Sequence, residues 1–295
     1  MLTLEALAAL VEEHREALSH PVASFTIGSE FFGGDSSPSL MGVVNRSADS
    51  WYRESVCLST RDALERTQRL FAQGAAVVDI GGESSLPDAE HVQADQQKDI
   101  LLPVVRGIAE RNRLISVETY HPEVAESCLK AGAGIINLTG SGESSEIYKQ
   151  IALHQAGVII CFVQGENVRE VGDLTLGSDP VPAMKEFFGT EIERARSAEV
   201  ERIFIDPGLG FYYRNLNDSE ERVRHQMRVF LNTFRLRELG WPICHALPHA
   251  FEYFGEEVRT AESFFAVLAA LGKTSLFRTH EVPKVRAVLE TLKVY

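Results

Sequence analysis

Arg278 and His280 are the residues whose types and spacing best fit chemistry on an anion. They follow the apolar run Ser275–Phe277 and lie two positions apart, so in an extended strand both side chains point to the same side. A guanidinium and an imidazole at such a place can bind phosphate, and barrel enzymes commonly bind phosphate after their last strand. A mutually satisfied structural pair is the alternative interpretation.

Further polar residues follow most of the other apolar runs. Asp206 begins an Asp-Pro-Gly that by itself is also a common turn, and Asn137 by itself also fits a turn or a cap. Their convergence is stronger evidence than any single motif, because the carboxyl ends of parallel strands meet at the face where barrels build active sites. The residues after successive runs are Asn45, Ser47 and Asp49; Ser84 and Ser85; Glu118; Asn137; Asp206; and Arg278 with His280.

Short apolar runs separated by amphipathic stretches supply the elements that must position these residues. Each run suits a strand buried on both faces, and about eight strand-then-helix repeats predict an α/β fold of the closed (β/α)8 TIM-barrel type. We assign residues 39–295 to the barrel and residues 1–38 to an N-terminal helical extension packed on it. In that extension we expect a helix over 3–18 and an irregular segment over 24–40. The runs are Gly42–Val44, Ala75–Ile80, Leu114–Val117, Ala133–Asn137, Val158–Phe162, Ile203–Ile205, Ile243–Ala246 and Ser275–Phe277.

Composition excludes several classes of function. The chain has 295 residues, of which 44% are hydrophobic, and a formal net charge of −13. This charge disfavours nucleic acid and anionic membrane surfaces as partners, and no run reaches the roughly 18 apolar residues of a membrane span. The cysteines are far apart and form no C-x-x-C, which indicates buried free thiols and a reducing cytoplasm.

Motifs at the strand ends resemble, in order, those of dihydropteroate synthase. The resemblance runs from about residue 41 to residue 285 and implies a pterin-binding (β/α)8 barrel. That family joins p-aminobenzoate to a dihydropterin that carries a CH2–pyrophosphate group, and pyrophosphate leaves. The matching segments are Met41–Ser50, Asp79–Ser85, Val117–Tyr120, Ile135–Asn137, Asp206–Phe211 and Arg278–Val282.

The resemblance implies which residues bind the pterin. Asp206 and Asn137 correspond to residues that hold the ring, and Glu118 stands where the family has an aspartate that also faces the pterin. An aminopyrimidinone offers adjacent N–H donors, which a buried carboxylate can accept in bidentate fashion. Glutamate at position 118 in place of this aspartate keeps the charge and adds a methylene group.

The resemblance also implies a pyrophosphate site and closing loops. Asn45, Arg278 and His280 correspond to groups that hold the pyrophosphate, with Mg²⁺ near Asn45 and no organic cofactor. Fixed donors there would stabilise the departing anion electrostatically. The family is usually dimeric, so a homodimer is expected. The residues that correspond to mobile loops over the acceptor are Ser47, Asp49, Ser84 and Ser85.

The chain departs from the family pattern at several charged positions. The family's Ser-Arg-Lys after the seventh strand is here Pro248-His249-Ala250, and the arginine of its second loop is here Leu86. Two interpretations follow: a divergent enzyme with impaired or altered activity, or a non-catalytic barrel that binds a pterin or another ligand. A compensating cation would have to come from Arg46, Arg214 or His249.

A metal site is a further alternative. His245, His249 and His280, together with Glu118, have side chains of metal-binding types. Pro248 makes a regular helical i,i+4 spacing of the first two histidines unfavourable. The sequence therefore favours the pterin site over the metal site.

Overall fold

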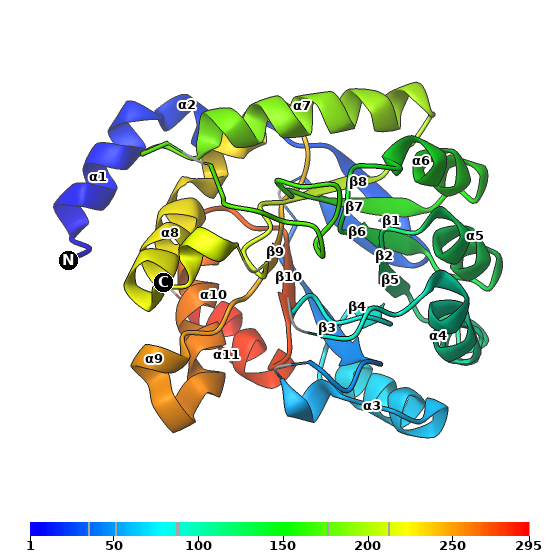
Figure 1. Cartoon of the computed structure of the whole chain (residues 1–295). Helices are drawn as coiled ribbons and strands as arrows, with labels where there is room; N and C mark the ends of the chain where they lie inside the picture. Colours follow the sequence, from blue (N-terminus) through cyan, green and yellow to red (C-terminus); the bar gives the residue numbers. More distant parts are fainter. Residues whose placement is uncertain (35, 51, 87–88, 176, 212, 295) are drawn as a thin grey trace.

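Parallel strands form the centre of the computed structural model (Figure 1), which describes residues 1–34, 36–50, 52–86, 89–175, 177–211 and 213–294. The sheet order is β8-β7-β6-β5-β4-β3-β10-β9, and a bridge between Ile205 and Ile243 brings β8 and β9 together, so the barrel is nearly closed. The predicted (β/α)8 fold is confirmed. Its strands are β3 (Ser39–Asn45), β4 (Val77–Gly81), β5 (Ile115–Thr119), β6 (Ile135–Leu138), β7 (Gly157–Cys161), β8 (Ile203–Asp206), β9 (Cys244–Ala246) and β10 (Leu276–Thr279).

Helices surround the strands and cover their outer faces (Figure 1). Local signals set several helix ends: Ser59 Oγ accepts from Asp62 N at the start of α3, and Pro122 occupies the first turn of α5. In the described ranges no helix is long and apolar enough to cross a membrane. The helices of the barrel are α3 (Thr60–Ala72), α4 (Ala94–Ala109), α5 (Pro122–Lys130), α6 (Ser144–Leu153), α7 (Val181–Ser197), α8 (Ser219–Asn232), α9 (Phe251–Phe254), α10 (Ala261–Leu271) and α11 (Val282–Leu292), with short 3-10 turns η1 (Arg53–Ser55), η2 (Arg214–Leu216), η3 (Thr233–Leu239) and η4 (Gly255–Thr260).

The first segment of the chain differs from the expected helix and irregular stretch. The helix breaks at His14, whose φ of −126° and ψ of 31° are not helical, which leaves α1 (Leu4–Glu13) and α2 (Arg15–Ser19). The segment expected to be irregular instead contains an antiparallel hairpin of β1 (Ser24–Ile27) and β2 (Glu30–Gly33).

That hairpin closes the amino-terminal end of the barrel. Phe25 and Phe32 both make edge-on contacts with Phe204 of β8, at ring distances of 5.1 and 5.3 Å. Ile27 packs against the barrel strands close to Gly157. Alternating Phe25 and Ile27 are the strand pattern that the glycine and serine content of this segment obscured.

Two apolar clusters follow from the alternation of side chains along the strands. One lies between strands and helices and includes Val78 and Ile80. The other, the interior cluster, fills the amino-terminal part of the barrel beside the hairpin and includes Val77, Ile135 and Leu276. All four cysteines are buried and free, as predicted.

Candidate functional site

A cavity that is open to solvent lies at the carboxyl ends of the strands. It brings together residues from both halves of the chain, as the strand-end pattern predicted. The two ends of the barrel therefore differ: apolar side chains fill the amino-terminal end, and polar groups line an open cavity at the carboxyl end. The predicted residues that line the cavity are Asn45, Ser84, Ser85, Glu118, Asn137, Asp206, Arg278 and His280.

Strand alternation explains why these side chains point inward. Val77 and Leu276 belong to the interior cluster, and the residues two positions further along their strands are Asp79 and Arg278. Residues two apart in a strand share a side, so both charged groups point into the barrel above the apolar cluster.

Arg278 lies between two carboxylates. Its Nε donates to Oδ2 of Asp79 at 2.7 Å, and its Nη2 donates to Oε2 of Glu118 at 2.6 Å. Asn137 Nδ2 donates to the same Asp79 oxygen at 3.0 Å, and Cys161 Sγ donates to Asn137 Oδ1 at 3.2 Å. Three of the residues expected to hold pterin and pyrophosphate, Glu118, Asn137 and Arg278, thus form one internal network. Its centre, Asp79, was not among the predicted site residues.

Burial raises the pKa of Glu118 to about 7. Arg278 favours the charged form and works against this shift, whereas the nearby carboxylates of Asp79, Glu83 and Asp206 add to it. Glu118 therefore changes charge near neutral pH, and a proton on it would weaken its attraction to Arg278.

Asp206 lies at the base of the cavity with 3% of its surface exposed. Its Oδ1 accepts from Gly208 N at 2.8 Å. In the part of the chain that the structure describes, no lysine, arginine or histidine forms an ion pair with it, since Arg278 pairs with Asp79 and Glu118. Burial raises the pKa of Asp206 to about 6, although the backbone N–H of Gly208 and the charge of Arg278 favour the ionised form.

Asn45 ends β3 and has a fixed amide orientation. Its Nδ2 donates to Ser50 Oγ at 2.8 Å and also to Ser55 Oγ. The amide nitrogen is therefore committed to protein acceptors, and Oδ1 is the atom that can serve as a metal ligand. Mg²⁺ binds hard oxygens, often one or two from protein and the rest from water and substrate phosphate, so this donor fits the ion.

His280 is held by a residue that the sequence analysis missed. Glu262 on α10, which is 1% exposed at its side chain, accepts from His280 Nδ1 at 2.8 Å and from His280 N at 3.1 Å. Tyr52 stacks on the imidazole at 4.5 Å. The ring is therefore fixed in orientation, with a buried carboxylate behind it.

The predicted loop residues divide into two groups. Ser84 and Ser85 line the cavity, whereas Ser47 and Asp49 are not among its lining residues. Ser47 Oγ accepts from Asp49 N at 3.2 Å, and Asp49 Oδ2 accepts from Glu90 N at 3.1 Å. Ser47 thus orders the loop after β3, and Asp49 ties it to the loop after β4.

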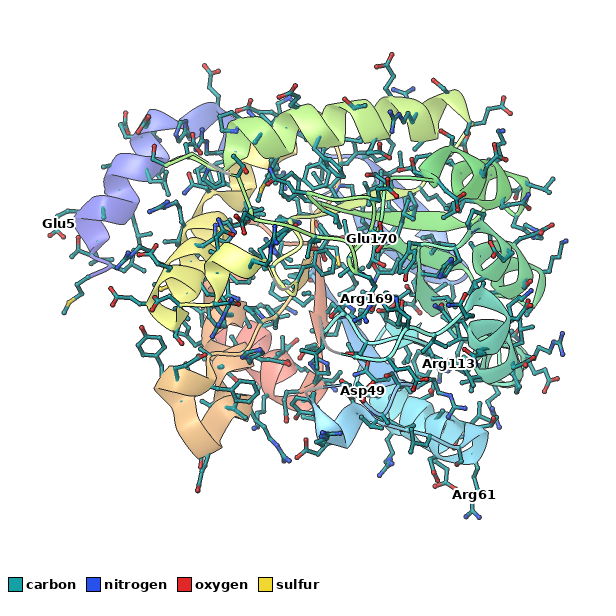
Figure 2. The ribbon with its side chains drawn as sticks, in the orientation of Figure 1. Glu5, Asp49, Arg61, Arg113, Arg169 and Glu170 are labelled. Atoms are coloured by element: carbon teal, nitrogen blue, oxygen red, sulfur yellow. The ribbon has the colours of Figure 1, made fainter. Side chains whose placement is uncertain are left out.

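Arg169 also fixes the loop after β4. It comes from the loop after β7, its side chain is 1% exposed, and it donates to the carbonyl oxygens of Ser84, Leu86 and Ala89. Figure 2 shows Arg169 within the outline of the barrel, whereas Arg61 lies at the outer edge of the molecule, on α3. A buried arginine with several backbone acceptors orders a loop strongly, so this loop is held over the cavity.

The three cations considered as compensating groups do not supply a charge in the cavity. Arg46 is buried and donates to backbone carbonyls of Cys57 and Ile100. Arg214 is 75% exposed at its side chain and pairs with an acidic surface residue. His249 lines the cavity, but burial lowers its pKa to about 4 and leaves it neutral.

The alternative metal site is not formed. His245 lies in the core, where its Nε2 is 2.8 Å from Thr233 Oγ1, and burial lowers its pKa to about 3. Within the described ranges, no group of three or more His, Cys, Asp or Glu residues could hold a metal ion.

Fold and site together define a (β/α)8 barrel that binds ligands at the carboxyl ends of its strands. Residues 41–247 match the family of pterin binding enzymes, and the chain belongs to that family. The dihydropteroate synthase of Synechocystis sp. is 30% identical over 221 residues, which are 74% of this chain and 73% of that protein. A Mycobacterium bovis protein named inactive dihydropteroate synthase 2 is 30% identical over 268 residues, 85% of this chain and 80% of that protein.

Solved structures agree with this assignment. The dihydropteroate synthase of Xanthomonas albilineans with 4-aminobenzoic acid superposes with a TM-score of 0.75 at 26% identity, over 92% of this chain and 97% of that one. The Burkholderia cenocepacia enzyme complexed with 7,8-dihydropteroate gives 0.76 at 25% identity, over 92% and 96%. The chain is thus a divergent, dihydropteroate synthase-like member of the family.

Proposed function

We propose that this chain binds a dihydropterin carrying a CH2–pyrophosphate group and transfers it to an arylamine only slowly. The observation that carries the proposal is Asp206, a buried carboxylate at the base of the cavity with no described cation paired to it. The aminopyrimidinone of a pterin offers adjacent N–H donors that such a carboxylate accepts. Membership of the pterin binding enzyme family supports the same ligand.

The other cavity residues have complementary tasks in this proposal. Asn137 and Glu118 flank the ring, and Arg278 and His280 hold the pyrophosphate. In the reaction, the acceptor nitrogen bonds to the CH2 carbon, the bond from that carbon to the pyrophosphate oxygen breaks, and the nitrogen loses a proton. Oδ1 of Asn45 would hold Mg²⁺ together with phosphate oxygens, and the ion would supply positive charge to the leaving group.

Non-catalytic pterin binding is the second candidate function. It is favoured by the engagement of Arg278 with Asp79 and Glu118, because a cation held by two carboxylates attracts pyrophosphate less. It is also favoured by Pro248-His249-Ala250, which supplies no charged side chain at neutral pH in place of the family's arginine and lysine. The similarity to a protein named inactive dihydropteroate synthase 2 points the same way.

Pyrophosphate release separates the two candidates. Purified protein is mixed with dihydropterin pyrophosphate, 4-aminobenzoate and Mg²⁺, and released pyrophosphate is followed over time. Each missing charged contact in a desolvated site lowers the rate by about 10²–10³, although such losses are not strictly additive. We expect turnover far below about 1 s⁻¹, the ordinary range for enzymes. Turnover at or above that rate would contradict the proposal, and binding with zero release would favour the non-catalytic candidate.

A homodimer in the cytoplasm, without an organic cofactor, is the expectation for the assembled protein. Light scattering after size exclusion gives the mass in solution. A mass equal to that of one 32.7 kDa chain would contradict the dimer.

A further inference from the structure

Arg222 is a cation of the cavity that no motif of the sequence predicted. It lies near the start of α8, its side chain is 14% exposed, and it lines the same cavity as Asp206 and Arg278. Among the described lining residues, Arg222 and Arg278 are the two guanidinium groups. Since Arg278 is held by Asp79 and Glu118, Arg222 is the candidate for a second anion contact.

The partner of Arg222 is an accessible carboxylate. Glu252 of α9 places Oε1 2.5 Å from Nη2 of Arg222, and 38% of the Glu252 side chain is exposed. Burial works against the charged form of Glu252. The hydrogen bond from Arg222, together with other contacts, outweighs this effect and lowers the pKa of Glu252 to about 2. Figure 1 shows α8 and α9 on the same side of the barrel.

Arg222 can exchange Glu252 for another carboxylate. The new ion pair replaces the old one, and water solvates the released Glu252, whose side chain is 38% exposed. Arg222 itself is mostly desolvated, and its Nε is buried without a hydrogen-bond partner among the described residues. A ligand carboxylate that displaces Glu252 would leave no buried charge unpaired. Leu209, Phe211 and Pro248 line the same cavity and offer apolar surface for an aromatic ring.

We propose that Arg222 binds the carboxylate of the arylamine acceptor and that Glu252 occupies Arg222 as an internal competitor until the acceptor arrives. This inference rests on the proposed function, because it assigns the acceptor side of the same cavity. Arg222 thus supplies, from a helix, the cation for the acceptor carboxylate that the segment Pro248-His249-Ala250 does not offer.

Calorimetric titration with two matched ligands tests the assignment. 4-Aminobenzoate and its neutral analogue 4-aminobenzamide are titrated into protein saturated with a dihydropterin and inorganic pyrophosphate. We expect wild type to prefer the benzoate. Arg222→Met should weaken benzoate binding about tenfold or more, as for loss of a charged hydrogen bond, and leave amide binding unchanged. Glu252→Gln should strengthen benzoate binding several-fold, because it removes the competing charge.

Controls keep the test independent of folding and of the pterin. Arg224→Met, on the exposed side of α8, should leave both affinities unchanged. If Arg222→Met fails to fold, Glu252→Gln carries the test alone. The same titrations without pterin separate acceptor binding by Arg222 from pterin binding. If the protein binds no dihydropterin but Arg222→Met still weakens benzoate binding, only the proposed function is overturned. Equal benzoate affinity in wild type and Arg222→Met, weaker binding in Glu252→Gln, or no benzoate binding by wild type would overturn the inference.

Discussion

Nη2 of Arg278 donates to Oε2 of Glu118 across 2.6 Å, inside the cavity that both residues line. The charge expected to neutralise a leaving pyrophosphate is therefore balanced by the protein itself. Because the pKa of Glu118 is raised to about 7, this balance depends on pH near neutrality.

Glu118→Gln should strengthen pyrophosphate binding. The amide keeps nearly the same size but removes one of the two negative charges on Arg278, so a pyrophosphate anion meets less competition. Arg278→Ala should have the opposite effect and weaken binding by about 1.5–3 kcal/mol, the value for a hydrogen bond to a charged group. Titration of pyrophosphate into the wild type and both variants measures the two changes in affinity. Unchanged affinity in Arg278→Ala would remove Arg278 from the anion site.

Arg278→Ala should also destabilise the fold. It leaves the carboxylates of Asp79 and Glu118 buried without their cation, and breaking a buried ion pair in this way costs about 3–5 kcal/mol. Urea unfolding at pH 8, where Glu118 is mostly ionised, measures the loss. A smaller loss at pH 5.5 is expected, because protonation of Glu118 then relieves the unpaired charge. Equal losses at both pH values would contradict the role of Glu118.

Asp206→Asn should stabilise the empty protein at alkaline pH. The folded pKa of Asp206 is about 6, above its unfolded value of about 4, so its ionisation opposes folding. Stability is therefore lost as pH rises from about 4 to about 6, and the loss is complete above that range. Removing the charge should raise the free energy of unfolding by about 2–3 kcal/mol at pH 8 and have little effect at pH 3.5. Denaturant unfolding at the two pH values provides the test. Destabilisation at pH 8 would show that Asp206 has a cationic partner.

Arg169→Ala should release the loop after β4. The substitution leaves the carbonyl oxygens of Ser84, Leu86 and Ala89 without their donor, so the chain beside these three residues should be cleaved faster in limited proteolysis. Arg61→Ala is the matched control, because Arg61 is 85% exposed at its side chain and pairs only with Glu65 among the described residues. Equal cleavage rates in the two variants would exclude Arg169 as the support of this loop.

The strands and their polar ends could be predicted from sequence because both signals are local. Each buried run is followed within a few residues by the group that lines the cavity, as Phe204 and Ile205 are followed by Asp206. The sequence also indicates that Asp79 is buried and paired. It stands inside the apolar run Val77-Val78-Asp79-Ile80, and a carboxylate in such a run requires a buried partner.

The partners of the site residues could not be predicted, because tertiary structure alone brings them together. Arg278 and Asp79 are 199 residues apart in the chain, and Arg169 is 85 residues from Ser84. Nothing near Glu262 in sequence indicates that it binds His280, and nothing near Arg222 indicates that it faces the cavity. The candidate compensating cations that the sequence offered do not supply a charge in the cavity, whereas Arg222 reaches it from α8.

Calorimetric titration of dihydropterin pyrophosphate into the wild type and Asp206→Asn tests whether Asp206 is the centre of a pterin site. Without an acceptor no transfer occurs, so the heat reports binding alone. We expect saturable binding at one site per chain in the wild type. The affinity should be lower by about tenfold or more in Asp206→Asn, since the asparagine cannot accept two N–H donors as a carboxylate does. Absence of binding in the wild type, or equal affinity in the two proteins, would contradict a pterin site centred on Asp206.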